Sequence, residues 1–309
     1  MSDKSAIEWT DATWNPVTGC SKVSPGCAYC YAETLSLRFG WSRLPWTPDN
    51  AAENVVLHPE RLDQPLKWRT PRMVFVNSMA DLFHPLVPPE FIARVWMRME
   101  AASDHTFQIL TKRPERMQVV VDDLPYLPNV WLGTSIENDH WISRADTLRA
   151  TRAAVRFISA EPLLGPLSSL NLAGIDWLIV GGESGGPPRR ALVRKGVHTR
   201  GTRGNGQVPL AVEPRPEALQ WVRELRDRAG TSGTAFFLKQ WGGRTPKAGG
   251  RELDGRTWDE MPLLRLAATS SEPEFRHVGW SLDAIPRDDV RKIGGEREPR
   301  SRNGTTIEA

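Results

Sequence analysis

Three cysteines are the residues of this 309-residue chain whose types and spacing most clearly indicate chemistry. Cys20, Cys27 and Cys30 follow a Cys-x6-Cys-x2-Cys pattern. The closing Cys-x-x-Cys turn can direct two thiolates at one metal centre, and the glycines and the proline around the longer loop allow it to fold back and deliver the third. Thiolate ligands suit zinc ions and iron–sulfur clusters. The segment therefore indicates a metal centre.

Three interpretations of the cysteine segment compete, since an odd number of cysteines makes a disulfide framework unlikely in a reducing compartment. A structural zinc site needs a fourth ligand, and none of the six histidines lies at a finger-like spacing from the cysteines. A redox dithiol would not need Cys20. A [4Fe–4S] cluster with one open iron uses all three thiolates and requires no fourth. We favour the open cluster, with the zinc site and the dithiol as alternatives.

Short apolar runs recur along the chain and predict buried parallel strands. The runs are Met73–Val76, Phe107–Leu110, Val130–Gly133, Val155–Ile158, Trp177–Val180 and Ala235–Leu238, with one further strand expected ahead of the cysteines. Helical periodicity occurs between them, over Pro89–Ala102, His140–Ala154 and Glu217–Arg228. The alternation predicts an α/β fold, a partial or complete parallel (β/α) barrel of six to seven strands.

Polar or charged residues follow each predicted strand, where parallel β/α folds collect their functional groups. A polar strand exit can also be an ordinary loop or helix cap. We nevertheless expect these strand ends to face one shared cavity beside the cysteines: Asn77, Ser78, Asp81, Ser135, Glu137, Glu161, Glu183 and Lys239. Two interpretations of His84 remain, as a hydrogen-bonded turn residue or as a metal ligand.

The bulk composition describes an ordinary globular protein. The apolar fraction is 39% and the charged fraction is 25%. The net charge of +3 is too small to indicate a nucleic-acid-binding protein by itself. No apolar run is long enough for a membrane span, and the N-terminus lacks the features of a signal peptide. We therefore expect a cytoplasmic protein without a membrane partner.

Two segments differ from the rest in composition. Residues 185–212 hold five arginines and one lysine without an acidic residue, and their glycines and prolines predict a long basic loop inserted in the domain. The C-terminal residues 286–309 lack apolar periodicity, which predicts a disordered tail. The expected domain therefore covers residues 1–285.

The cysteine segment resembles the radical S-adenosylmethionine (SAM) superfamily, whose usual motif is Cys-x3-Cys-x-aromatic-Cys. Cys27-Ala28-Tyr29-Cys30 matches the second half of that motif, whereas the first spacing is six residues instead of three. More closely, the chain to about residue 285 is similar to the phage-associated three-Cys-motif family. The matching stretches are IEWTDATWNPVTGC, CAYCYAE, VNSMADLFH, LTKRP, WLGTSIEN, FISAEPLLGP, GGESG and FFLKQWG.

The resemblance implies a radical SAM-type barrel and two cofactors, a [4Fe–4S] cluster on the three cysteines and SAM on the open iron. One electron from the cluster would cleave SAM to methionine and a 5′-deoxyadenosyl radical, which abstracts hydrogen from a substrate. By position, the resemblance implies that SAM is bound by Tyr29, Asn77, Ser78, Asp81, Ser135 and Glu137. A Gly-Gly-Glu sequence is usual in the superfamily after the second strand, but it is absent from that place here, and Gly181-Gly182-Glu183 comes several strands later.

The resemblance further implies that Glu161, Glu183 and Lys239 face the substrate as catalytic residues, with Lys112 and Arg113 on the same side. A nucleotide or nucleic-acid base is the substrate that a phage-associated enzyme with a basic loop suggests. A reductant protein for the cluster and a genetically linked partner protein would be its partners. The alternative is a zinc-stabilised nucleic-acid-binding protein without catalytic activity.

Overall fold

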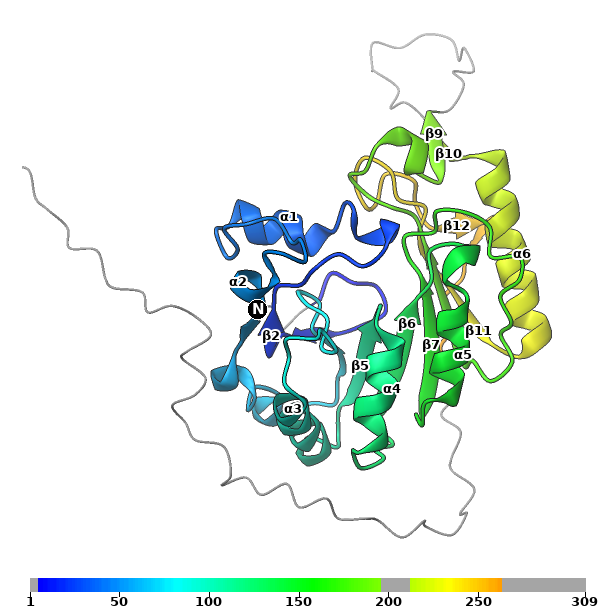
Figure 1. Cartoon of the computed structure of the whole chain (residues 1–309). Helices are drawn as coiled ribbons and strands as arrows, with labels where there is room; N and C mark the ends of the chain where they lie inside the picture. The colour runs from blue at the N-terminus through cyan, green and yellow to red at the C-terminus, as the bar shows by residue number, and fades with distance from the viewer. Residues whose placement is uncertain (1–4, 196–211, 263–309) are drawn as a thin grey trace, which may run out of the picture. The chain divides into compact units, whose positions relative to one another are not determined.

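Seven parallel strands form the central sheet of the computed structural model, which describes residues 5–195 and 212–262. Their spatial order is β1-β4-β5-β6-β7-β8-β11, and every neighbouring pair is parallel. The strands are β1 (Ala12–Trp14), β4 (Met73–Val76), β5 (Thr106–Thr111), β6 (Val130–Ser135), β7 (Val155–Ala160), β8 (Trp177–Gly181) and β11 (Ala235–Gln240). The sheet curls into a half barrel whose edge strands β1 and β11 are not paired with each other in the described residues (Figure 1).

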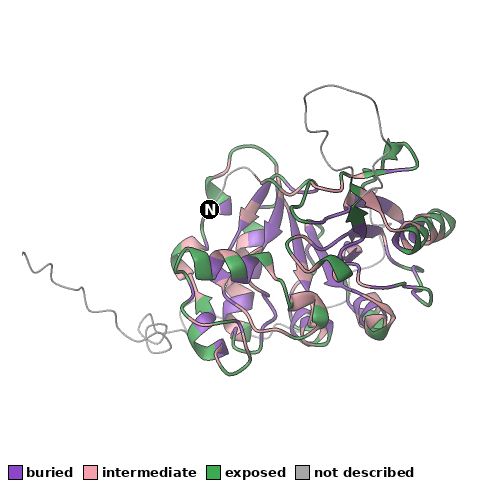
Figure 2. Ribbon diagram, turned by 90° about the horizontal axis from the view of Figure 1, so that it is seen from above, coloured by how far each residue is buried: buried purple, intermediate pink, exposed green. Residues whose placement is uncertain are grey.

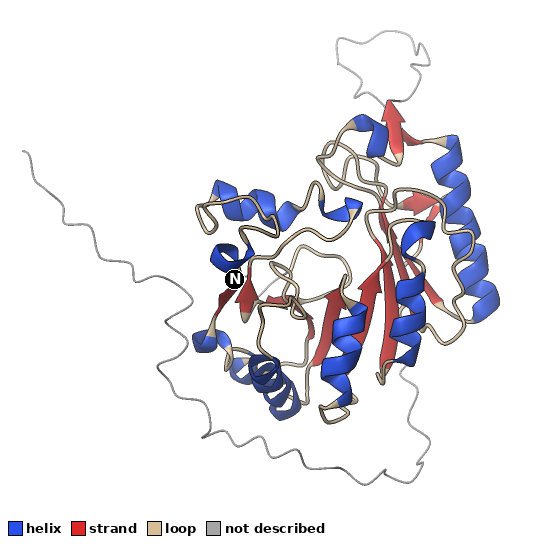
Figure 3. Cartoon of the chain, in the orientation of Figure 1, coloured by secondary structure: helices blue, strands red, loops and turns tan. Residues whose placement is uncertain are grey.

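Helices lie in every connection between successive strands except that from β7 to β8, and four of them pack on the outer face of the sheet (Figure 3). They are α3 (Pro89–Ala101), α4 (Pro114–Asp122), α5 (Ser143–Ala150) and α6 (Pro216–Ser232), while α1 (Tyr31–Arg38) and α2 (Ala51–Asn54) follow the cysteines. Three of the four outer helices begin at a proline, which fits a first helical turn because the missing N–H would have no partner there. The predicted alternation of strands and helices is confirmed, and the barrel is partial.

Short elements complete the described chain. Two-residue or three-residue strands pair as β2 (Val17–Thr18) with β3 (Val56–Leu57), β9 (Val193–Lys195) with β10 (Val212–Pro214), and β12 (Glu252–Leu253) with β13 (Arg256–Thr257). The 3-10 turns are η1 (Pro25–Cys27), η2 (Pro59–Arg61), η3 (Pro65–Lys67), η4 (Asp139–Trp141) and η5 (Pro188–Arg190).

One predicted helix was too long. The expected helix over His140–Ala154 begins instead as η4, where Asn138 accepts a hydrogen bond from the His140 N–H, and continues as α5 from Ser143 only to Ala150. At its end the Thr151 hydroxyl donates to the Thr147 carbonyl oxygen, and Thr151 takes an extended backbone conformation that leads into β7. The local side-chain bonds at both ends therefore shorten the helix.

Alternate side chains of each strand point to opposite faces of the sheet, so the strands contribute to two apolar layers. Residues such as Val74, Ile109 and Leu178 point outward and pack with helix residues in one large core. Residues such as Phe75, Phe157 and Trp177 point inward and pack with Trp9 on the concave face. Figure 2 shows the strands as the most continuously buried part of the chain. The inner residues form an aromatic layer on the concave face of the half barrel.

The described residues belong to one compact unit. The predicted boundary at residue 285, the predicted tail at 286–309 and most of the predicted basic loop, residues 196–211, lie outside the described residues. None of the helices in the described ranges is both long and apolar enough to span a bilayer.

Candidate metal centre

The cysteine segment is attached to the carboxyl end of β4 at its first residue. The Gly19 N–H donates to the Met79 carbonyl oxygen at 2.9 Å, and Gly19 forms an isolated parallel bridge with Ala80. Gly19 has φ +82°, and a Cβ there would lie 1.8 Å from the Asn54 carbonyl oxygen. Only glycine satisfies both conditions. The chain then crosses the carboxyl edge of the sheet, forms η1 and enters α1 after Cys30 (Figure 1).

The first cysteine is held beside an ion pair from β4 and β5. An Arg113 Nη1–H group lies 3.7 Å from the Cys20 sulfur and also donates to Asp81 Oδ2 at 2.9 Å. The second guanidinium nitrogen donates to the Ser21 carbonyl oxygen at 2.9 Å. Asp81 additionally accepts from the Thr111 hydroxyl at 2.7 Å. Arg113 therefore links the sheet to the start of the cysteine segment.

The second cysteine lies beside a buried carboxylate. Ser24 stands 3.8 Å from the Cys27 sulfur and donates a hydrogen bond to Glu137, which follows β6 and has no exposed surface. Glu137 also pairs with Lys112 Nζ at 3.0 Å and with Arg144 Nη1 at 3.1 Å. The strand ends β5 and β6 thus contact the middle of the cysteine segment.

A third ion pair reaches the same segment from β8. Both oxygens of Glu183 accept hydrogen bonds from Arg190 at 2.7 Å. Arg190 also donates to the Pro25 carbonyl oxygen at 2.8 Å and lies 5.2 Å from the centre of the Tyr29 ring. Glu183 and Tyr29 were predicted to act separately, on substrate and on cofactor, and the structure joins them through Arg190.

Glu161 and Lys239 form a fourth pair at the carboxyl ends of β7 and β11. Their charged atoms are 3.1 Å apart, and Ser159 donates to the second oxygen of Glu161 at 3.1 Å. Gly181 makes room for this carboxylate, because a Cβ there would lie 2.4 Å from Glu161 Oε1. The two residues predicted to face the substrate are therefore paired with each other.

The remaining predicted residues lie around the β4 end. Ser78 donates from its hydroxyl to the Asn15 side-chain oxygen, and its carbonyl oxygen accepts from the Tyr31 hydroxyl at 2.6 Å. Asn77 has φ 59°, and its side-chain oxygen accepts from the Val17 N–H. Its Nδ2 is buried without a hydrogen-bond partner among the described residues. Ser135 is buried at the end of β6, where its carbonyl oxygen accepts from Arg144.

The cysteines carry no disulfide and are partly buried. Burial raises the pKa of Cys20 to about 12, with a further increase from Asp81, and burial also raises the pKa of Cys30. The neighbouring Cys27 is a smaller cause of both increases. Such thiols stay protonated in the metal-free protein, and metal binding would release their protons. As placed, no group of three or more His, Cys, Asp or Glu side chains in the described ranges could hold a single metal ion.

Three contributors to this region were not predicted from the sequence: Arg144, Arg190 and Ser24. Arg144 lies in the first turn of a helix, and nothing in its sequence context distinguishes it from a solvent-exposed arginine. Arg190 was seen only as part of a basic run. Ser159, by contrast, is one of the predicted strand-end residues, and it precedes Glu161 by two and so shares its side of the strand.

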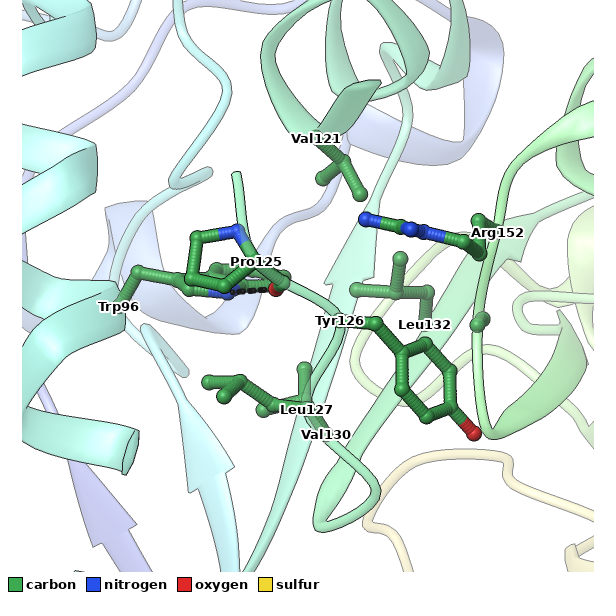
Figure 4. Close-up of a pocket in the computed structure, with 9 residues that line it drawn as sticks. Trp96, Val121, Pro125, Tyr126, Leu127, Val130, Leu132 and Arg152 are labelled. Atoms are coloured by element: carbon green, nitrogen blue, oxygen red, sulfur yellow. Dashed lines mark hydrogen bonds between the residues drawn. The ribbon is translucent and has the colours of Figure 1, made fainter. Parts of the chain in front are cut away.

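A small crevice lies at the opposite edge of the sheet, at the amino end of β6 (Figure 4). Its lining contains no His, Cys, Asp or Glu side chain, and Trp96 there donates to the Pro125 carbonyl oxygen at 2.8 Å. The crevice is therefore separate from the cysteine segment in place and in chemistry.

Comparison with known proteins gives a family without an assigned activity. The family model described as "Protein of unknown function (DUF5131)" matches residues 4–199 and 211–262, and the chain belongs to this family. The match leaves out residues 200–210, which fall in the predicted basic loop. No curated protein and no solved structure matches the chain.

Proposed function

We propose that this chain is a radical SAM enzyme with a [4Fe–4S] cluster on Cys20, Cys27 and Cys30, and that its half barrel is of the radical SAM type. The single observation that carries the proposal is the position of three free, partly buried thiols on one segment fastened across the carboxyl edge of a parallel half barrel. In parallel β/α folds this edge is where catalysis takes place.

The residues fit such a cluster in their chemistry. Thiolates are the usual protein ligands of iron–sulfur clusters, and three of them leave one iron open for a cofactor. Arg113 lies 3.7 Å from the Cys20 sulfur and would offset negative charge on a bound cluster. The buried, unpaired Nδ2 of Asn77 is a donor in need of an acceptor, such as a carboxylate of a bound molecule.

When bound, the cluster would supply the one electron that cleaves SAM to methionine and a 5′-deoxyadenosyl radical. The protein's own share is to bind and orient. The exposed ring of Tyr29 offers a surface for stacking an adenine. Glu161 and Lys239 hold a carboxylate and an ammonium group together near the end of β7, where they can hydrogen-bond a polar substrate. A nucleotide or nucleic-acid base is the proposed substrate, and an electron-transfer protein the proposed reductant, in the cytoplasm.

Anaerobic reconstitution tests the proposal. Wild-type protein should bind about four irons per chain, show iron–sulfur absorption, and release 5′-deoxyadenosine from SAM after reduction. Cys27→Ala should lose both the iron and the product. The matched control is Val23→Ala, a truncation at an exposed position of the same segment, which should retain them.

Two outcomes would contradict the proposal. Stoichiometric zinc in place of iron, with the fold retained, would favour the zinc-stabilised nucleic-acid-binding protein. A fully loaded cluster that yields no 5′-deoxyadenosine, even with nucleotides present, would argue against radical chemistry.

A further inference from the structure

Glu137 joins the cysteine segment to the sheet through a fully buried junction. The Glu137 side chain has no exposed surface, and its partners come from three different elements. Lys112 follows β5, Arg144 belongs to α5, and Ser24 belongs to the cysteine segment. Arg144 is itself buried and also donates to the Ser135 carbonyl oxygen at 2.8 Å.

The charges at this junction hold the carboxylate in one position. Oε1 accepts from Ser24 and Lys112, and Oε2 accepts from Arg144, so three of about four acceptor positions are used. A buried ionised group that loses its partners destabilises the fold, so the Glu137 carboxylate stays between Lys112 and Arg144. A residue held in this way has little capacity left to bind a cofactor, which is the role that the resemblance implies for it.

The backbone of the cysteine segment packs directly on this carboxylate. A Cβ added to Gly26 would lie 2.4 Å from Oε1 and 2.6 Å from Cγ of Glu137. Gly26 lies in η1 and does not have a positive φ, so its backbone would accept alanine. The close approach to Glu137 is therefore the reason that no side chain fits there.

This contact controls the position of one thiol. Gly26 is adjacent to Cys27, and Ser24 lies within 3.8 Å of the Cys27 sulfur while it donates to Glu137. The Cys27 N–H donates to the Ser24 carbonyl oxygen at 2.9 Å, which closes the turn around them. Any movement of the turn away from Glu137 would displace the Cys27 sulfur.

We propose that Glu137 is a positioning residue that fixes the Ser24–Cys27 turn against the sheet before any metal binds. The six-residue spacing between the first two cysteines makes a long loop that would otherwise have to be ordered at the cost of binding energy. A preformed turn removes that cost. This inference rests on the metal-binding half of the proposed function and does not depend on SAM chemistry.

Amide hydrogen exchange of the metal-free protein tests the preformed turn. The Cys27 and Ala28 N–H groups should be protected in the wild type, since both are hydrogen-bonded within the turn. Gly26→Ala should reduce their protection about 10-fold or more, as expected when a hydrogen bond to a charged group is lost. Ser24→Ala should act in the same direction from the loop side, and both variants leave the buried ion pairs in place. Glu161→Gln is the matched control, a carboxylate at another strand end paired with a lysine, and should leave both amides unchanged.

Cadmium binding to the same metal-free variants gives a second readout. Thiolate absorption should report affinities about 10–100-fold weaker in Gly26→Ala and Ser24→Ala than in wild type, the usual loss when a group that orients a metal ligand is altered. Normal protection and normal cadmium affinity in both folded variants would overturn the inference. If wild-type protein instead takes up no iron while the amides respond as expected, the proposed function fails and the positioning role stands.

Discussion

The concave face of the half barrel has two layers that come from the same strands yet differ in kind. The lower layer is aromatic, with Trp177 at its centre; Trp9, Trp131, Phe157 and Phe237 have ring centroids within 6.0 Å of it. The upper layer begins with Ser159, two residues beyond Phe157 and in register with Ser135, and it ends in charged residues. Packing determines the residue types of the lower layer, and polar contacts determine those of the upper layer.

In the upper layer, each of the four strand-end carboxylates forms an ion pair. Asp81 pairs with Arg113, Glu137 with Lys112 and Arg144, Glu161 with Lys239, and Glu183 with Arg190. Three of these groups contact the cysteine segment, while the Glu161 pair lies beside it at β7 and β11. The comparison shows that much of the charge at the carboxyl edge of the sheet holds the cysteine segment in place. The lower layer would then stabilise the fold, and the upper layer would hold the cysteine segment in position.

The largest stability effect should come from the centre of the lower layer. Trp177→Ala removes a fully buried side chain with four aromatic neighbours, and should lower the free energy of unfolding by about 3–5 kcal/mol. Urea denaturation measures this difference. Trp41→Ala is the matched control, since Trp41 is 63% exposed and should change stability by only about 0.5 kcal/mol. Equal losses for the two variants would remove the distinction between the layers.

A smaller effect should come from the boundary between the layers. Gly133→Ala would place a methyl group 2.4 Å from the Phe157 ring, and overpacking of this kind should cost about 1–3 kcal/mol. Thermal unfolding of the metal-free protein would report it. Gly230→Ala in α6 meets no atom within 4 Å and should stabilise by up to about 1 kcal/mol through helix propensity. A stable Gly133→Ala variant would mean that the inner aromatic layer can move.

A third effect should appear as a dependence of stability on pH. Burial, and then the nearby Arg113, lowers the pKa of His84 from 6.5 to about 4. Below pH 6.5 the unfolded chain therefore binds a proton that the folded chain does not, so this contribution to stability is present above pH 6.5 and is lost as the pH falls toward 4. Unfolding measured across that range should show the loss.

The histidine itself provides the controls for that experiment. The Leu86 N–H donates to His84 Nδ1, so the neutral ring carries its proton on Nε2, beside the Ser21 hydroxyl at 2.8 Å. His84 is thus a hydrogen-bonded turn residue in this structure. His84→Gln should flatten the profile between pH 6.5 and 4, whereas His140→Gln, at an exposed position, should leave it unchanged. A profile that His84→Gln does not alter would assign the pH dependence to other groups.

The sequence by itself determined the strands and the edge at which polar groups gather. Runs such as Val130–Gly133 are apolar on both faces, as buried parallel strands are, and each predicted run lies inside an observed strand. The carboxyl ends of parallel strands meet at one edge, so Glu137, Glu161 and Glu183 could be placed together without coordinates. The spacing of the cysteines likewise indicated a metal centre, which the proposed experiments test.

Only the tertiary structure decided which of these groups contact one another. Arg144 reaches Glu137 because α5 packs beside β6, and Arg190 reaches Pro25 across 165 residues of sequence. Hydrogen bonds and ion pairs act over a few ångströms, whereas sequence patterns report only which face of a strand or helix a residue occupies. For this reason the sequence could assign charged residues to the site, but their pairing with each other and with the cysteine segment required the folded chain.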